Sequence, residues 1–452
     1  MRRPEDAALD RDILRLAFPA FLALVAEPMF LLADAAVVGH LGTPELAGLG
    51  VAGAVLQTAV GLCVFLAYGT TAAVARHLGA GDTRGALTQG IDGVWLAVLI
   101  GVLVTVAGVA LTEPLVGLFG PSPAVTEHAV TYLRIAFLGT TPLLVMLATT
   151  GVLRGLQDTR TPLVVAVAGN LLNVVLNVTL VYGVGSWGGL GLAGSAIGSV
   201  LAQVASALAL LAVVVRGARR EGARLAPDVR GIRAAGRAGV ALVVRTLTLR
   251  AALLVTTYAV TIGATGRDQE IDLATHQLAL TLWTFLAFVL DAIAIAAQAI
   301  TGRHLGAGDA AAARAVTDRM VRWGIVSGIV TGLLLAAASP LLGPLFTADA
   351  AVRDLLVPVL VVAALAQPIA GVVFVLDGVL IGAGDGPYLA RAGLLVLLLH
   401  APAVLAVALL GGGLVVVWVV FAVVFMGARL VVLVHRARGD AWLVTGVRSL
   451  TP

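Results

Sequence analysis

The feature that most constrains the fold is a seven-residue motif that occurs twice. Arg-His-Leu-Gly-Ala-Gly-Asp stands at 76–82 and again, letter for letter, at 303–309, an offset of 227 residues. At the same offset, Gly151–Asp158 resembles Gly378–Asp385, and a weaker third match lies in the same order along the chain. Collinear matches of this kind indicate two homologous halves, and an internal repeat sets the architecture before any other reading.

Long apolar blocks fill both halves. The chain is 60% hydrophobic and 12% charged, about half the charged share of a typical soluble domain. A run of about 20 apolar residues spans the hydrocarbon core of a bilayer, and it does so as a helix because a helix satisfies every backbone polar group internally. The expected spans are 14–38, 46–75, 88–111, 126–150, 162–183, 190–215, 240–264, 272–300, 316–338, 353–381, 388–410 and 413–434. The sequence therefore predicts an all-α polytopic membrane protein with twelve transmembrane helices.

Arginine, the only strongly basic residue type because lysine is absent, is unevenly distributed between successive loops. It is concentrated in both termini, in a linker from about 216 to 237, and in the loops after the second, fourth, eighth and tenth blocks. The other loops hold only Arg267 and Arg353, each beside acidic residues. Because basic loops stay on the cytoplasmic side, both termini are expected in the cytoplasm and the chain in the cell inner (plasma) membrane.

An even number of spans in each half makes the repeat parallel, with its axis along the membrane normal. Two six-helix bundles are expected, 1–220 and 221–452, around a central cavity that suits alternating access. The arginine-rich linker has two open explanations, a loop that sets topology or a segment that binds anionic lipid head groups. Membrane lipids and a small organic substrate are the expected partners of a monomer. Nucleic acid is not an expected partner, because the arginines lie between membrane-spanning blocks.

Charged residues inside apolar blocks are candidate functional residues, since each costs about 2.5–3.5 kcal/mol to insert at a helix centre. In the first block Glu27 and Asp34 are seven residues apart and share one helix face, with Pro28 loosening the helix between them. Asp34 is the first candidate for binding and releasing a coupling ion, and Glu27 is the second. The alternative for Asp34 is a hydrogen bond or cap to a neighbouring helix.

Asparagines in the fifth block form a second set of candidates. Asn170, Asn173 and Asn177 follow the spacing i, i+3, i+7, which places three amides in one stripe facing the bundle interior. Such a stripe serves as interhelical hydrogen bonding, as part of a substrate cavity, or as both.

The second half has its own polar residues. Asp291 and Gln298 are seven residues apart on the eighth block, and Asp377 stands near the end of the tenth. Arg245 and Arg250 lie in the early part of the seventh block. Arg250 is either deep enough in the membrane to need Asp291 or Asp377 as a partner, or its side chain extends to the cytoplasmic interface. The glutamines considered for the cavity are Gln57, Gln277 and Gln367.

Motifs of known enzymes are missing. The sequence has no His-Glu-x-x-His, Gly-x-Ser-x-Gly or Gly-x4-Gly-Lys motif, so no catalytic residue, metal site or nucleotide cofactor is expected. An ion gradient of H⁺ or Na⁺ is the natural energy source. The repeated motif itself is expected to form a tight turn, with its glycines easing the backbone and with Asp82 and Asp309 capping the next helix. The single Cys63 rules out a disulfide within the chain.

Several stretches together resemble the multidrug and toxic compound extrusion (MATE) transporters, in particular their DinF-like branch. The resemblance covers nearly the whole chain. The stretches that carry it are 32–42, 76–82, 274–277, 290–298, 303–309 and 376–385.

This resemblance implies a secondary antiporter that exports organic, often cationic and amphipathic compounds in exchange for H⁺ or Na⁺. It implies that Asp34 couples the ion. Members of the family often carry a second Asp on the fifth span, where this sequence has Asn177. That departure weakens a two-carboxylate mechanism in the first half. The cluster of Asp291 and Asp377 resembles what some branches use for binding.

Other functions remain open alongside this one. A flippase for lipid-linked sugars would need a cationic cavity, for which Arg250 and Arg134 are the candidates. An intramembrane enzyme would need a reacting pair such as Asp291 and Asp377. A receptor or scaffold is disfavoured because no sizeable soluble segment is present.

Overall fold

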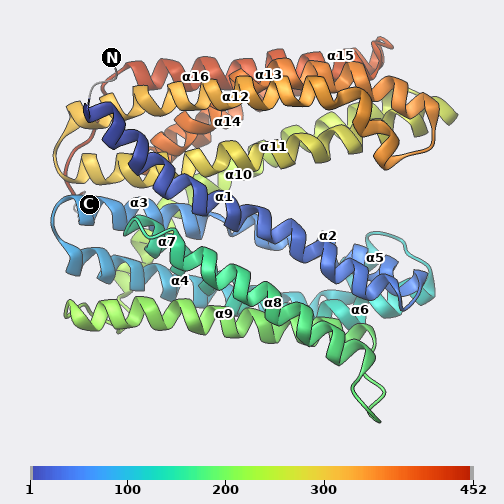
Figure 1. Ribbon diagram of the computed structural model, residues 1–452, viewed down its shortest axis with the longest axis horizontal. Coiled ribbons are helices and arrows are strands. Elements are labelled where there is room, and N and C mark those ends of the chain that lie inside the picture. The colour runs from blue at the N-terminus through green and yellow to red at the C-terminus, as the bar shows by residue number, and fades with distance from the viewer. Residues whose placement is uncertain (1–3, 448–452) are drawn as a thin grey trace. The chain divides into compact units, whose positions relative to one another are not determined.

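The computed structural model describes residues 4–447, and nearly all of them lie in helices (Figure 1). The helices of the first half are α1 (Pro4–Gly39), α2 (Thr43–Leu62), α3 (Phe65–Gly79), α4 (Thr83–Ala110), α5 (Thr112–Gly117), α6 (Pro123–Leu138), α7 (Thr140–Gly155), α8 (Arg160–Tyr182) and α9 (Leu192–Arg220). Those of the second half are α10 (Val229–Gly263), α11 (Gly266–Gly306), α12 (Ala310–Phe346), α13 (Ala350–Gly382), α14 (Gly386–Leu409), α15 (Gly413–Val420), the π-helical turn η1 (Phe421–Met426) and α16 (Gly427–Arg438).

Twelve membrane spans emerge from the described helices, which confirms the predicted number. Eleven stretches are long and apolar enough to cross a bilayer, and the pair α6 and α7, bent by 46°, makes the twelfth. The second span is interrupted between α2 and α3, and the last contains η1. These breaks were not predicted, because an apolar run shows the length of a span but not where its backbone bends.

The chain forms two compact units. The first unit contains Phe18–Gly239. The second unit contains Met1–Ala17 together with Val240–Gly446. The sequence places the division at 220/221, whereas the compact units divide at Gly239/Val240. The first turns of α1 and of α10 therefore belong to a different unit from the rest of the same helix.

Close backbone packing holds the second unit together. A Cβ added at Gly324 of α12 would lie 2.5 Å from the carbonyl oxygen of Gly371 on α13, and one at Gly378 would lie 2.3 Å from that of Ala294 on α11. Small residues at such contacts allow helices to approach closely where lipid removes the hydrophobic driving force. Glycine is thus required at these contacts, and α11, α12 and α13 form a tight three-helix layer.

The repeated motif forms the same turn in both halves, as predicted. Asp82 accepts a hydrogen bond of 2.7 Å from the backbone N–H of Gly85 and caps α4. Asp309 accepts one of 2.8 Å from Ala312 and caps α12. Gly81 and Gly308 have φ of 76° and 82°, the left-handed region that favours glycine.

Each unit also fixes the segment by which the chain leaves it for the other unit. In the second unit, the guanidinium of Arg319 on α12 binds Asp10 on α1 with N–O distances of 2.7 and 2.5 Å, and the indole of Trp323 donates to the same carboxylate at 2.8 Å. In the first unit, Arg224 of the linker between α9 and α10 lies 3.5 Å from the buried Asp92 on α4.

Candidate functional site

A buried carboxylate stands at the centre of the first unit. Asp34 lies on α1 and its side chain is only 4% exposed. Its Oδ1 accepts hydrogen bonds from Nδ2 of Asn177 on α8 (2.7 Å) and from the hydroxyl of Ser195 on α9 (2.5 Å). Its Oδ2 accepts one from the hydroxyl of Tyr132 on α6 (3.2 Å). Four helices thus meet on one carboxyl group.

The asparagine stripe extends this network. Nδ2 of Asn177 also contacts Oδ1 of Asn173 at 3.1 Å, and Nδ2 of Asn173 donates to Ser199 at 3.0 Å. Helices α8 and α9 approach closely here, since a Cβ added at Gly198 would lie 2.2 Å from Oδ1 of Asn177. The spacing that suggested a common face therefore brings Asn173 and Asn177 into one hydrogen-bonded chain with Asp34.

One acceptor of this network is unsatisfied. Oδ1 of Asn177 is buried and has no hydrogen-bond partner among the residues that the structure describes. A buried polar atom without a partner costs about 1–3 kcal/mol. All three donors to Asp34 are neutral groups. The network therefore surrounds Asp34 with hydrogen bonds and no cation, and it keeps a spare acceptor within it.

The other first-half candidates lie outside this network. Asn170 is half-buried and donates to the backbone carbonyl of Ala26 at 2.9 Å, so it ties α8 to α1. Gln57 is exposed on α2. The side chain of Glu27 lies outside the described part of the structure.

A buried ion network occupies the second unit. Asp377 on α13 pairs with Arg245 on α10 and, at 3.2 Å, with Arg429 on α16. The Arg429 guanidinium also lies 5.9 Å from the ring centre of Phe374 and 5.7 Å from that of Phe425. Charge and cation–π contacts together explain how Arg429 is held while only 8% exposed.

Of the two alternatives that the sequence left open for Arg250, the deep pairing with a carboxylate is not seen in the described structure. Its side chain is exposed and pairs with neither Asp291 nor Asp377 in the described structure. Arg245 and Arg429 are the partners of Asp377 instead. Asp291 is half-buried and close enough to interact with Arg429 electrostatically.

The glutamines of the second half divide by exposure. Gln298 and Gln367 are buried, at 2% and 1% exposure, whereas Gln277 is exposed on α11. A single glutamine in an apolar block carries no periodic signal, so its face could not be assigned from the sequence.

Sequence reasoning missed four residues of these networks, Tyr132, Ser195, Ser199 and Arg429, and it also missed Asp92, which pairs with Arg224 outside them. Tyr132 and Ser195 bind Asp34, yet an isolated hydroxyl in an apolar block gives no signal of its partner. Asp92 and Arg429 are charged residues within predicted spans, and that fact alone was a usable signal for both.

Known proteins resemble this chain over most of its length. The MatE family model matches residues 19–179 and 247–406. The protein DETOXIFICATION 44, chloroplastic, of Arabidopsis thaliana is 30% identical over 398 residues, which cover 84% of this chain and 74% of that protein. The DNA damage-inducible protein F of Escherichia coli is 30% identical over 378 residues, covering 83% and 81%.

A solved structure shares the fold. The bent form of the Vibrio cholerae MATE transporter VcmN superposes with a TM-score of 0.85 at 19% identity, covering 97% of this chain and all of the other. The two family-model segments each cover the greater part of one half, in keeping with the duplicated architecture.

Proposed function

Because the chain belongs to the MATE family, whose members are membrane transporters and not enzymes, we propose that it is a secondary antiporter. It exports organic, amphipathic, often cationic compounds in exchange for H⁺, with Na⁺ as the alternative coupling ion. It works in the inner (plasma) membrane as a monomer, with both termini in the cytoplasm, and the placement of arginine in its loops supports this orientation.

The observation that carries the proposal is the set of partners around Asp34. Three neutral donors, from Asn177, Ser195 and Tyr132, bind its ionised form. Hydrogen bonds to a charged group are worth about 1.5–3 kcal/mol each. Together they are comparable to the roughly 5.5 kcal/mol that moves a two-state equilibrium from 1:99 to 99:1. A change of charge on this one group therefore has enough energy to bias the conformation of the unit.

Proton binding rearranges this network in a defined way. A neutral carboxyl group has one O–H to donate, so at least one of the three groups that now donate to Asp34 must become its acceptor or move away. The hydroxyls of Ser195 and Tyr132 adapt by rotation. The amide of Asn177 adapts by turning its unsatisfied Oδ1 toward the new O–H. Proton binding thus alters contacts that join α1 to α6, α8 and α9.

Transport follows when substrate and proton bind the two conformations with different affinity. With Asp34 ionised, the first unit keeps its network intact and holds a cationic substrate more tightly. Proton uptake from outside removes the charge, loosens the contacts of α1 and releases the substrate. Proton release on the other side restores the starting state.

Reconstituted vesicles test this proposal. The full chain is placed in proteoliposomes with an imposed H⁺ or Na⁺ gradient, and efflux of a fluorescent organic cation is followed. Asp34→Asn is expected to abolish gradient-driven efflux while the protein stays folded and inserted. Asp268→Asn, the same chemical change at an exposed position, is expected to transport normally. Full efflux by Asp34→Asn would overturn the mechanism.

The flippase alternative finds less support in the arginines that could line a cationic cavity. A lipid-linked diphosphate needs cationic groups that are free to bind it. Arg134 pairs with Glu113 at 2.6 Å, and Arg429 pairs with Asp377, which is shared with Arg245. The two buried arginines of the second unit therefore already have carboxylate partners, since both pair with Asp377 and Asp291 also interacts with Arg429.

A further inference from the structure

The connection between α8 and α9 is a hairpin of nine residues, 183–191. Its counterpart at the 227-residue offset, between α14 and α15, begins at Leu410 and has only three residues, 410–412. The hairpin of the first half is therefore longer than the connection that the same fold uses in the second half. Both α8 and α9 are long and apolar enough to cross a membrane, so the hairpin lies at a membrane face.

The hairpin is uncharged and exposes apolar side chains. No charged residue occurs anywhere from 161 to 215, a stretch that contains most of α8, the hairpin and most of α9. Tyr182, Val184, Trp187 and Leu190 are each between 45% and 65% exposed. The other five tryptophans of the chain are buried or half-buried. An exposed apolar patch of this kind indicates a contact with something other than water.

The neck of the hairpin is closed by backbone contacts. The N–H of Leu190 donates to the carbonyl of Leu180 at 2.7 Å, which satisfies one of the last carbonyls of α8. Gly183 has φ of 84°, and a Cβ added there would lie 1.9 Å from the carbonyl oxygen of Trp187. These contacts hold the two arms of the hairpin together and fix the direction in which its tip, 184–188, extends.

The tip has no side-chain partner within the protein. None of the side chains at 184–188 makes a hydrogen bond, an ion pair or a ring contact with residues 4–447. Figure 1 shows the hairpin at the lower right, extending away from the ends of α8 and α9. The apolar side chains of the tip are therefore directed away from the helices of the first unit.

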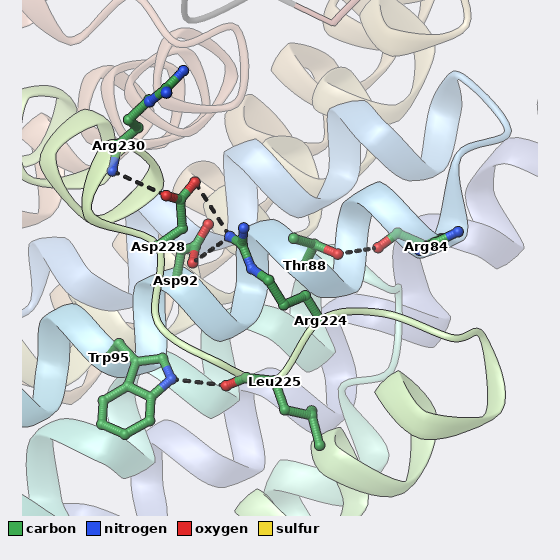
Figure 2. Close-up of polar contacts among 8 residues, drawn as sticks. All are labelled: Arg84, Thr88, Asp92, Trp95, Arg224, Leu225, Asp228 and Arg230. Carbon is green, nitrogen blue, oxygen red and sulfur yellow. Dashed lines mark hydrogen bonds and ion pairs between the residues drawn. The ribbon is translucent and has the colours of Figure 1, made fainter.

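The connection at the other end of α9, the linker to α10, is held in a different way. Figure 2 shows the guanidinium of Arg224 between two carboxylates, 3.5 Å from Oδ1 of Asp92 and 3.3 Å from Oδ2 of Asp228. The indole of Trp95 donates to the carbonyl of Leu225 at 3.0 Å. Side chains of the protein thus fix the charged linker, whereas the tip of the uncharged hairpin has no such contact.

We propose that the α8–α9 hairpin binds the membrane itself, with Trp187 at the boundary between lipid head groups and acyl chains. Two opposing requirements set this depth. Exposed apolar side chains favour lipid over water. The non-helical backbone of the tip has N–H and C=O groups that the hydrocarbon core cannot satisfy, whereas the head-group region can. Tryptophan meets both requirements, because its ring is apolar and its indole N–H is a donor.

This contact bears on the helices around Asp34. The hairpin joins α8 to α9, which supply Asn177 and Ser195 to that carboxylate. Binding to lipid fixes the ends of these two helices relative to the bilayer. The role is independent of the proposed antiport, because it concerns where the hairpin lies and not which ion Asp34 binds.

Tryptophan fluorescence of the full chain in phosphatidylcholine vesicles tests this placement. The emission of Trp187 is obtained by subtracting the spectrum of Trp187→Phe from that of the wild-type chain. Three quenchers are compared: lipid brominated near the head-group end of its acyl chains, lipid brominated near the chain ends, and iodide in the water. The matched control is Thr265→Trp in the Trp187→Phe background, which moves the exposed tryptophan to a turn beside Arg267 and Asp268. Subtraction of Trp187→Phe isolates its emission in the same way.

Trp187 emission is expected to fall about two-fold with bromines near the head-group end, less with bromines near the chain ends, and little with iodide, because its ring lies at the lipid boundary. The tryptophan of the control is expected to be quenched mainly by iodide. An unchanged melting temperature of Trp187→Phe confirms that this variant is folded.

Four results would overturn the proposal. Strong iodide quenching of Trp187 without lipid quenching would place the hairpin in water. Stronger quenching by bromines near the chain ends would contradict the interfacial depth. Equal lipid quenching of Trp187 and of the control would show a general property of exposed tryptophans. Protection from iodide without lipid quenching would assign the hairpin to a contact between copies of this chain.

Discussion

Asp92 and Arg319 stand at equivalent positions of the two halves, 227 residues apart, and carry opposite charges. Asp92 on α4 binds Arg224 of the linker, and Arg319 on α12 binds Asp10 of α1. Each pair fixes the segment by which the chain enters a new half. The duplication has therefore kept an ion pair between this helix and the segment that leads to the other half. In the first half the helix supplies the carboxylate, and in the second half it supplies the cation.

The two-bond contact of Arg319 with Asp10 is expected to be worth much more than a surface ion pair. Both side chains are largely buried, at 19% and 14% exposure. Arg319→Gln removes the cation that pairs with this carboxylate and leaves it the indole of Trp323, which costs about 2–4 kcal/mol at a largely buried site. A clear drop in the melting temperature of the purified chain is the measurement.

A matched control lies five residues away on the same helix. Arg314 pairs with Asp440, whose side chain is 91% exposed, so Arg314→Gln is expected to cost less than about 1 kcal/mol. The exchange Arg319→Asp with Asp10→Arg is expected to recover part of the lost stability. If Arg319→Gln and Arg314→Gln melt at the same temperature, the pair of Arg319 with Asp10 does not contribute more stability than the exposed pair.

Asn177 is expected to matter for transport because it connects Asp34 to the asparagine stripe. Asn177→Ala removes a donor at 2.7 Å from the carboxylate, a loss of about 1.5–3 kcal/mol and hence about 10- to 100-fold in coupled efflux. Asn170→Ala is the control, since among the described residues that amide binds the backbone of Ala26 and not Asp34, and a loss of less than about five-fold is expected. Equal loss in the two variants would show that the stripe acts only in packing. The assay is efflux from proteoliposomes under a proton gradient.

Asp377 is expected to be a structural residue of the second unit as well as a polar group in its interior. Asp377→Asn leaves Arg245 and Arg429 without the carboxylate they share, which is expected to destabilise the chain by about 3–5 kcal/mol. Asp354→Asn on the same helix is exposed and is expected to have little effect. The measurement is the melting temperature of Asp377→Asn and of Asp354→Asn in detergent, each compared with the wild-type chain. Wild-type stability with lost transport would instead assign Asp377 a direct role in binding.

The spans and turns were predictable because their causes are local. Twelve apolar runs, arginine in alternate loops and the caps at Asp82 and Asp309 each depend on residues close together in the sequence. The stripe of Asn173 and Asn177 was predictable for the same reason, since helical spacing sets which residues share a face.

The partners across helices were not predictable in the same way. The hydroxyl of Tyr132 reaches Asp34 from 98 positions along the chain, and no periodic pattern joins the two. Arg429, 52 positions after Asp377, binds it only because α16 packs against α13. The two alternatives for Arg250 could not be separated from the sequence, because depth in a helix does not tell which face a side chain occupies. Exposed Gln57 and Gln277 illustrate the same limit.

The cap at the start of α4 gives a pH dependence with a definite sign. The hydrogen bond from Gly85 and the neighbouring His77 lower the pKa of Asp82 from its ordinary 3.8 in the folded chain. A carboxyl group with a lowered folded-state pKa stabilises the fold fully above pH 3.8, and this contribution is lost as the pH falls through the folded-state value. Solvent screens the effect, because the side chain of Asp82 is 51% exposed.

Asp82→Ala is therefore expected to lower the melting temperature at pH 7 and at pH 5 by the same small amount, as the loss of an N-cap costs about 1 kcal/mol. The difference from the wild-type chain is expected to shrink toward pH 3, where the wild-type cap is also losing its charge. Asp82→Asn is the control, since asparagine caps equally well without titrating. It is expected to match the wild-type chain at pH 7. A difference between Asp82→Ala and wild type that persists unchanged at pH 3 and below would show that the charge of Asp82 contributes nothing to the cap.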